Sequence, residues 1–80
     1  MRTITRRETY QDIQIDKYYK SRKGRNVVKV TNVSKSTVFY KDVLGNKNYA
    51  SKKLFDHLYV QQNEEFISIR ILRALNKNED

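Results

Sequence analysis

The sequence predicts a mainly β domain that folds as a small barrel and ends in a C-terminal segment favouring a helix. Two segments, Val27–Val33 and Thr37–Val43, are rich in β-branched and aromatic residues and alternate in part between apolar and polar, as half-buried strands do. Polar turn residues at 34–36 and 44–46 separate the apolar segments. Residues 25–49 are therefore expected to form a three-stranded β-meander.

Length and composition indicate one folded domain with mobile ends. The chain has 80 residues, is 38% hydrophobic and 32% charged, and carries six Tyr and three Phe, too many aromatic residues for a disordered chain. The absence of cysteine excludes disulfides and thiolate metal sites. No apolar run is long enough for a signal sequence or a membrane span, so we expect a cytoplasmic protein without membrane contact.

Positive charge is concentrated in the β part of the chain. Residues 1–53 hold fourteen Lys and Arg against four acids, whereas residues 54–80 hold three against five, and the whole chain has a net charge of +8. A balance of this kind favours phosphate-rich or acidic partners through long-range steering and counterion release, although it also serves solubility.

The chain divides into an arm, a barrel and a C-terminal segment. Residues 1–9 are expected to form a mobile basic arm or a short first strand; such an arm is either a solvated terminus or able to lie along a phosphate backbone. Residues 10–62 form the barrel, whose first core strand is expected at residues 10–20 because Ile13 and Ile15 alternate there. Residues 63–80 are expected to form a helix and a frayed tail.

A basic loop follows the first strand. Gly24 marks the tip of this turn, which carries four cations and no acid, Lys20, Arg22, Lys23 and Arg25. Like charges crowded on one hairpin tip repel each other unless a counter-charge is bound. The loop is therefore a candidate phosphate-binding element, the alternative being a polar hairpin tip without a ligand.

Alternation assigns the faces of the two clearest strands. It places Val28, Val30, Val38 and Tyr40 in the core and directs Lys29, Thr31, Phe39 and Lys41 outward. A twist or bulge is expected at Asn32, and Gly45 and Asn46 both tolerate the positive φ that the second turn demands.

The aromatic residues leave alternatives open. Phe39 is either a stacking platform beside basic side chains or, because small barrels twist strongly, a core residue. Among the tyrosines, Tyr18, Tyr40 and Tyr49 are expected in the core wall and Tyr10 and Tyr19 at the surface.

A short helix is expected to close one end of the barrel. Ser51 is a good N-cap, and Leu54, Phe55 and Leu58 would share the buried face of residues 52–58. Lys52 and Lys53 occupy the first turn, where the helix dipole disfavours cations, which hints at a binding role. A short last strand at residues 59–60 follows. His57 lacks nearby metal-binding partners and is expected at the surface or its boundary.

The C-terminal segment fits a helix or a strand. Asn63 as cap, Glu64 and Glu65 in the first turn, and basic residues in the last turn predict a helix, with Phe66 and Ile69 outside its apolar face. Alternating isoleucines at 67, 69 and 71 fit a strand instead. We expect the helix, packed on the barrel or on another subunit, with a homodimer through residues 63–76 as one alternative.

The order of these segments resembles the small SH3-like barrels of the KOW and Tudor-like kind, which occur in bacterial proteins and short phage-encoded reading frames. The resemblance covers roughly residues 13–60 and is carried by the segments at 18–19, Gly24, 27–33, 37–42, 51–55 and 59–60. It implies a strongly bent five-stranded barrel with a one-turn helix before the last strand, residing in the host cytoplasm if phage-encoded. The class includes modules that contact RNA or DNA and modules that bind proteins.

The leading hypothesis is a non-enzymatic nucleic-acid-binding module of low sequence specificity that needs no cofactor. Its phosphate and base contacts are expected from Lys20, Arg22, Lys23, Arg25, Lys29, Phe39, Lys41, Lys47, Lys52 and Lys53. The alternative is a phage-type effector that docks on an acidic surface of a host protein and inhibits or redirects it. No spacing of nucleophile, histidine and carboxylate recommends an enzyme, so no catalytic or metal-binding residues are assigned.

Overall fold

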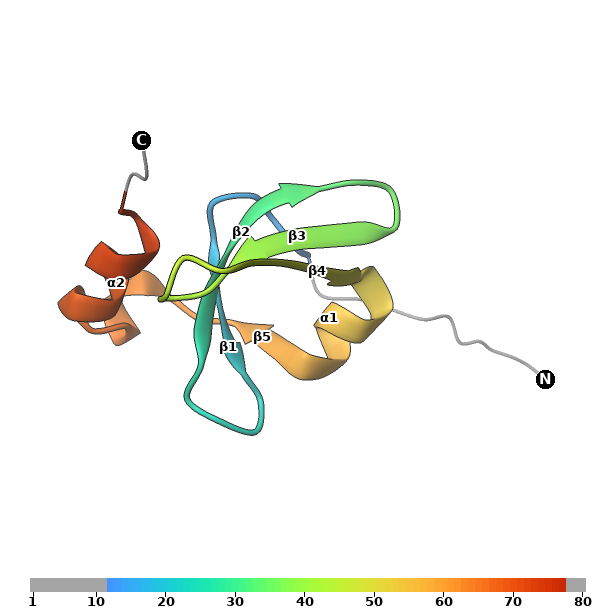
Figure 1. Ribbon diagram of the computed structural model, residues 1–80. Coiled ribbons are helices and arrows are strands. Elements are labelled where there is room, and N and C mark those ends of the chain that lie inside the picture. The colour runs from blue at the N-terminus through green and yellow to red at the C-terminus, as the bar shows by residue number, and fades with distance from the viewer. Residues whose placement is uncertain (1–11, 78–80) are drawn as a thin grey trace.

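The computed structural model describes residues 12–77, and the predicted arm at residues 1–9 lies outside this range. The described chain forms a five-stranded antiparallel sheet with two short α-helices and one 3₁₀ turn, which confirms the mainly β class (Figure 1). In chain order the elements are β1 (Tyr18–Ser21), β2 (Val27–Val33), β3 (Thr37–Lys41), β4 (Lys47–Ser51), α1 (Lys52–Leu58), β5 (Tyr59–Gln61), η1 (Glu64–Phe66) and α2 (Ile69–Leu75).

The strand order is β4-β3-β2-β1-β5, so β4 and β5 are the edge strands and α1 connects them. The predicted bulge is confirmed, because the register between β2 and β3 shifts between Val30 and Asn32. A bulge increases the local twist of a strand, and it lets the long β2 bend across the sheet. The sheet therefore presents a concave inner face and an outer face.

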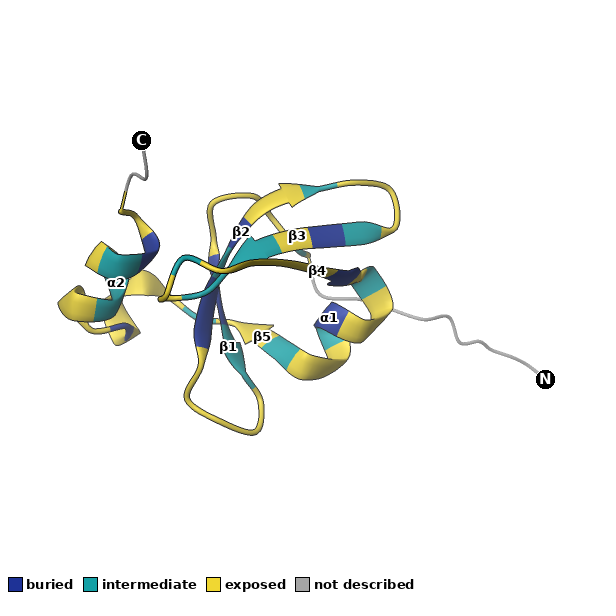
Figure 2. Cartoon of the chain, in the orientation of Figure 1, coloured by how far each residue is buried: buried dark blue, intermediate teal, exposed yellow. Residues whose placement is uncertain are grey.

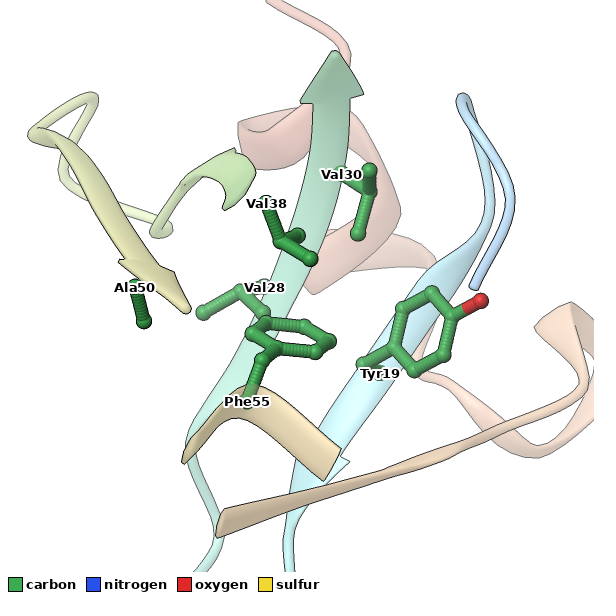
Figure 3. Close-up of a cluster of buried hydrophobic side chains, with 6 residues drawn as sticks. All are labelled: Tyr19, Val28, Val30, Val38, Ala50 and Phe55. Atoms are coloured by element: carbon green, nitrogen blue, oxygen red, sulfur yellow. The ribbon is translucent and has the colours of Figure 1, made fainter. Parts of the chain in front are cut away.

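The inner face carries the main core. Its fully buried or nearly buried side chains come from four strands and α1, and Figure 3 shows them converging: Tyr19, Val28, Val30, Val38, Ala50 and Phe55. Alternation predicts Val28, Val30, Val38 and Tyr40 here; the three valines are at most 1% exposed, whereas Tyr40 is half-buried and packs against the core. Alternation therefore identified the inward-facing side of β2 and β3.

Helix α1 covers this core, but with one buried residue rather than three. Ser51 caps the helix as predicted, since its hydroxyl accepts a hydrogen bond from the Leu54 N–H at 3.1 Å. Phe55 is fully buried, whereas Leu54 and Leu58 are 48% and 40% exposed, so their predicted burial is wrong. The helix spans the expected residues 52–58 and is therefore longer than the one turn that the resemblance implies. Phe55 is thus the one fully buried side chain that α1, a helix of about two turns, contributes to the core.

The first strand is shorter than the predicted segment at residues 10–20. Residues 15 and 16 form a turn with Asp16 at φ 67°, and pairing with β2 begins only at Tyr18. Ile13 packs half-buried against the core, but Ile15 is 47% exposed. The alternation of these two isoleucines therefore does not mark a strand, because the Asp16 turn interrupts it.

Strand β3 ends at Lys41 instead of Val43 because Asp42 organises the turn that follows. One carboxylate oxygen of Asp42 accepts hydrogen bonds from the N–H groups of Leu44 and Asn46, both at 3.0 Å. The positive φ expected in this turn is found at Gly45, at 87°, and not at Asn46. Gly45 alone adopts the left-handed conformation because it has no Cβ.

Helix α2 builds a second, smaller core on the outer face. Leu75, which is fully buried, packs with Tyr18, Val27 and Ile67. The Asn76 side chain adds polar contacts, since its Nδ2 donates to the Tyr18 hydroxyl at 2.8 Å and its Oδ1 accepts from Lys29 Nζ at 2.7 Å. The expected packing of the C-terminal segment on the sheet is therefore confirmed.

The C-terminal helix is nevertheless shorter than expected. Ser68 caps α2 by accepting from the Ile71 N–H at 3.3 Å, whereas Asn63 precedes η1 and makes no side-chain cap bond. Ile67 is extended between the two elements and buried, so it divides the predicted helix. Phe66 and Ile69 are 71% and 65% exposed, as expected for residues outside the apolar face.

Two tyrosine assignments are reversed. Tyr19 pairs with Val28 and therefore points to the inner face, where it is fully buried instead of exposed. Tyr49 pairs with Phe39 on the outer face and is 73% exposed instead of buried. Tyr18 is buried as expected, but beneath α2. Both faces of β1 are covered, which alternation within one strand does not reveal.

The buried Tyr19 makes the stability of the fold sensitive to high pH. Burial raises the pKa of this phenol above its ordinary value of 10.0, partly offset by the hydrogen bond from the Gln14 N–H at 2.9 Å. The folded state holds the proton more tightly than the unfolded state, so the stabilisation is complete below pH 10 and is lost as pH rises through the folded-state pKa.

The measurement is urea unfolding at about pH 8 and pH 11 for the wild type and Tyr19→Phe. At the lower pH we expect the variant to lose about 0.5–1.5 kcal/mol, because Gln14 N–H loses its acceptor. Between the two pH values it should lose less stability than the wild type. Equal losses would contradict a role for Tyr19 ionisation; Tyr40, whose pKa burial also raises, contributes in both proteins.

Candidate nucleic-acid interface

Three lysines form a row across the outer face of the sheet. Lys29 on β2 is directly opposite Lys41 on β3, which in turn is opposite Lys47 on β4. Residues directly opposite each other in an antiparallel pair project to the same face, and like charges in such positions destabilise a sheet. The lysine row (Lys29, Lys41 and Lys47) is thus an unfavourable arrangement for folding alone.

The row is only partly neutralised within the described chain. Lys29 Nζ lies 3.8 Å from an Asp16 carboxylate oxygen and also donates to Asn76 Oδ1. Neither Lys41 nor Lys47 makes a side-chain hydrogen bond or ion pair with another residue in the range 12–77. Two of the three ammonium groups are therefore available to an anionic partner.

An exposed aromatic pair lies beside the row. Phe39 and Tyr49 are cross-strand neighbours on β3 and β4, with ring centroids 6.2 Å apart and ring planes at 48°. Phe39 is 37% exposed, so its interpretation as a core residue is wrong and the stacking alternative remains. A shallow hollow of about 310 Å³ opens here, lined by Thr31, Asn32, Phe39, Tyr40, Lys47, Asn48 and Tyr49.

The basic loop between β1 and β2 does not join this surface. It projects from the sheet as an exposed hairpin tip (Figures 1 and 2). Lys20 Nζ donates to the Gly24 carbonyl at 2.9 Å, and the Arg22 guanidinium donates twice to the Asp56 carbonyl, at 3.1 and 3.2 Å. Arg22 thereby holds the end of α1, where the helix dipole favours a cation.

Lys23 and Arg25 in the same loop are exposed and make no side-chain hydrogen bond to another described residue. Lys52 and Lys53 lie in the first turn of α1, which packs against the inner face. The structure thus brings together Lys29, Phe39, Lys41 and Lys47 among the predicted site residues and leaves the loop and helix cations elsewhere.

Sequence reasoning missed Tyr49 as a member of this surface. The signal was present in the hairpin register: a five-residue turn at residues 42–46 places Lys47 opposite Lys41, and hence Tyr49 opposite Phe39. Alternation within β4 alone was misleading, because Tyr49 is an aromatic residue on the solvent-facing side of an edge strand.

Other classes of site find no support in the described residues. Within the range 12–77 no cluster of three or more His, Cys, Asp or Glu side chains could hold a metal ion. In the same part of the chain no helix is long and apolar enough to cross a membrane. His57 is exposed on α1, as expected.

Comparisons with protein-family models, with curated proteins and with solved structures give no match to this chain. The function is therefore inferred from the residues of the outer face.

Proposed function

We propose that this chain is an SH3-like barrel that binds single-stranded nucleic acid through its outer face. The barrel assignment is supported by the bent five-stranded sheet in which β1 pairs with both β2 and β5, and by the helix α1 between β4 and β5. This is the arrangement that the resemblance implies for SH3-like domains.

The observation that carries the binding proposal is the aromatic pair Phe39 and Tyr49 adjoining the unpaired Lys41 and Lys47. Single-stranded nucleic acid needs a surface of this composition, because aromatic rings stack on bases while cations track the backbone phosphates. A solvated surface chosen for solubility needs the lysines but not two neighbouring exposed rings.

The same geometry favours a single strand over a duplex. Bases in a duplex are stacked on each other and present only their edges, whereas unpaired bases offer their faces to aromatic side chains. Neither α-helix is built to enter a groove, since α1 and α2 have seven residues each and both pack on the sheet. Binding is thus directed by charge and stacking, with little sequence specificity.

The test is fluorescence anisotropy of the nuclease-treated protein with single- and double-stranded RNA and DNA at about 50 and 200 mM salt. We expect single strands to bind more tightly than duplexes and the affinity to fall steeply with salt. The variant Lys41→Gln/Lys47→Gln should reduce the slope of log K against log salt by about 1.4, because each phosphate contact on a single strand contributes about 0.7.

Lys53→Gln/Lys23→Gln is the matched control, since it removes two exposed cations away from the outer face. An equal change of slope in both double variants would contradict the assigned surface. No binding of the wild type at the lower salt would overturn the function, and the acidic protein partner would become the better hypothesis. A stoichiometric complex that survives nuclease treatment would then support it.

A further inference from the structure

A second cationic feature lies where α2 meets the turn between β3 and β4. The two elements enclose a hollow of about 610 Å³, lined by Lys41, Val43, Leu44, Gly45, Arg73, Ala74 and Lys77. Three of these residues are cations and none is an acid. We call this feature the α2 notch and its cations Lys41, Arg73 and Lys77.

The position of the notch is set by the docking of α2. Leu75 and Asn76 attach the helix to Tyr18 and β2, as described above. Arg73 lies in the last turn of α2 and Lys77 lies two residues beyond the end of the helix, and both line the hollow together with Lys41. The notch thus depends on tertiary packing and brings Lys41 together with Arg73, which lies 32 positions further along the sequence.

Helix electrostatics explain only part of this cluster. Cations at the C-terminal end of a helix interact favourably with its dipole, which accounts for Arg73 and Lys77. The helix dipole does not account for Lys41, which comes from β3 and lines the same hollow as Arg73 and Lys77. The nearest acid in sequence, Asp42, directs its carboxylate into the turn, where it accepts from the Leu44 and Asn46 N–H groups.

We propose that the α2 notch binds a backbone phosphate of the same strand whose base stacks on Phe39 and Tyr49. This inference rests on the proposed function and specifies the path of the ligand. Lys41 belongs both to the lysine row and to the notch, and it is two residues from Phe39 on the same face of β3. Two residues of a strand span about 6.6 Å, so base and phosphate sites are adjacent.

Arg73 is the residue best suited to hold the phosphate. Its guanidinium offers parallel donors that match two phosphate oxygens, whereas Lys41 and Lys77 supply point charges. The strand is therefore expected to run along β3 from the aromatic pair towards α2.

The experiment compares Arg73→Gln with Arg70→Gln, each in the full chain. Both variants remove one exposed arginine from α2, but Arg70 does not line the notch. With a fluorescein-labelled single-stranded oligonucleotide, Arg73→Gln should weaken binding about tenfold at low salt and reduce the salt slope by about 0.7. Arg70→Gln should change the affinity less than about twofold.

Lys77→Gln serves as the second variant, and circular dichroism of all three checks that α2 is retained. Lys77→Gln should also reduce the slope of log K against log salt by about 0.7. If the wild type binds and Phe39→Ala weakens it, but Arg73→Gln and Arg70→Gln behave alike, the notch is overturned while the proposed function stands. If the wild type does not bind at all, both are overturned.

Discussion

Replacement of Phe55 by Ala is expected to lower the free energy of unfolding by about 3–5 kcal/mol and leave much of the protein unfolded at 25 °C. Phe55 is fully buried and its ring contacts three others, with centroid distances of 5.2 Å to Tyr19, 5.2 Å to Tyr40 and 4.8 Å to Tyr59. The core of a domain of this size supplies only about 3–5 kcal/mol of net stability. The loss expected for Phe55→Ala is therefore comparable with the entire free energy of unfolding.

The measurement is urea unfolding followed by circular dichroism, with Leu54→Ala as the control. Leu54 is the neighbouring residue of α1 and is 48% exposed, so its truncation should cost less than about 1 kcal/mol. Phe55→Leu provides a measurable intermediate, with an expected loss of about 1–2 kcal/mol, should the Ala variant fail to fold. Similar losses for Phe55→Ala and Leu54→Ala would show that α1 does not close the core through Phe55.

Local patterns in the sequence predict much of this fold. Alternation identifies Val28, Val30 and Val38 as inward-facing, and Ser51 is recognisable as a helix cap because its hydroxyl can accept an N–H three residues on. These features depend on residues close together in the chain. Local chemistry is therefore sufficient to predict them.

The incorrect burial predictions concern residues whose burial depends on contacts between segments distant in the sequence. Leu54 and Phe55 are both apolar and adjacent, and only the angle at which α1 crosses the sheet separates the exposed residue from the buried one. Tyr18 and Tyr19 are both buried because α1 and α2 cover opposite faces of β1. Neither result follows from the periodicity of a single segment.

The candidate site also combines features that local sequence predicts with features that depend on tertiary packing. That Lys29, Phe39 and Lys41 face outward follows from alternation, but the lysine row exists only in the register of three strands. Counting cations in the loop after β1 overestimates its free charge, because Lys20 and Arg22 donate to main-chain carbonyls. The α2 notch could not be predicted, since it depends on where α2 docks.

Removal of either ring of the aromatic pair is expected to weaken binding of a single strand by about 1–3 kcal/mol, or about 5- to 150-fold. Phe39→Ala and Tyr49→Ala remove a face on which a base stacks, whereas Phe66→Ala removes the 71% exposed ring on η1 and should leave the affinity unchanged. Unlike the lysine variants, the two ring variants should retain the wild-type salt slope, because they remove no phosphate contact.

An abasic oligonucleotide of the same length separates stacking from a general loss of structure. The wild type should bind this ligand more weakly than the intact strand, whereas Tyr49→Ala should discriminate less between the two, because the ring that reads the difference is gone. Tyr49→Phe keeps the ring and should bind like the wild type. If Tyr49→Ala still distinguishes the intact from the abasic strand as well as the wild type does, then bases do not stack on Tyr49. The exposure of this side chain, 73%, would then need a different partner to explain it.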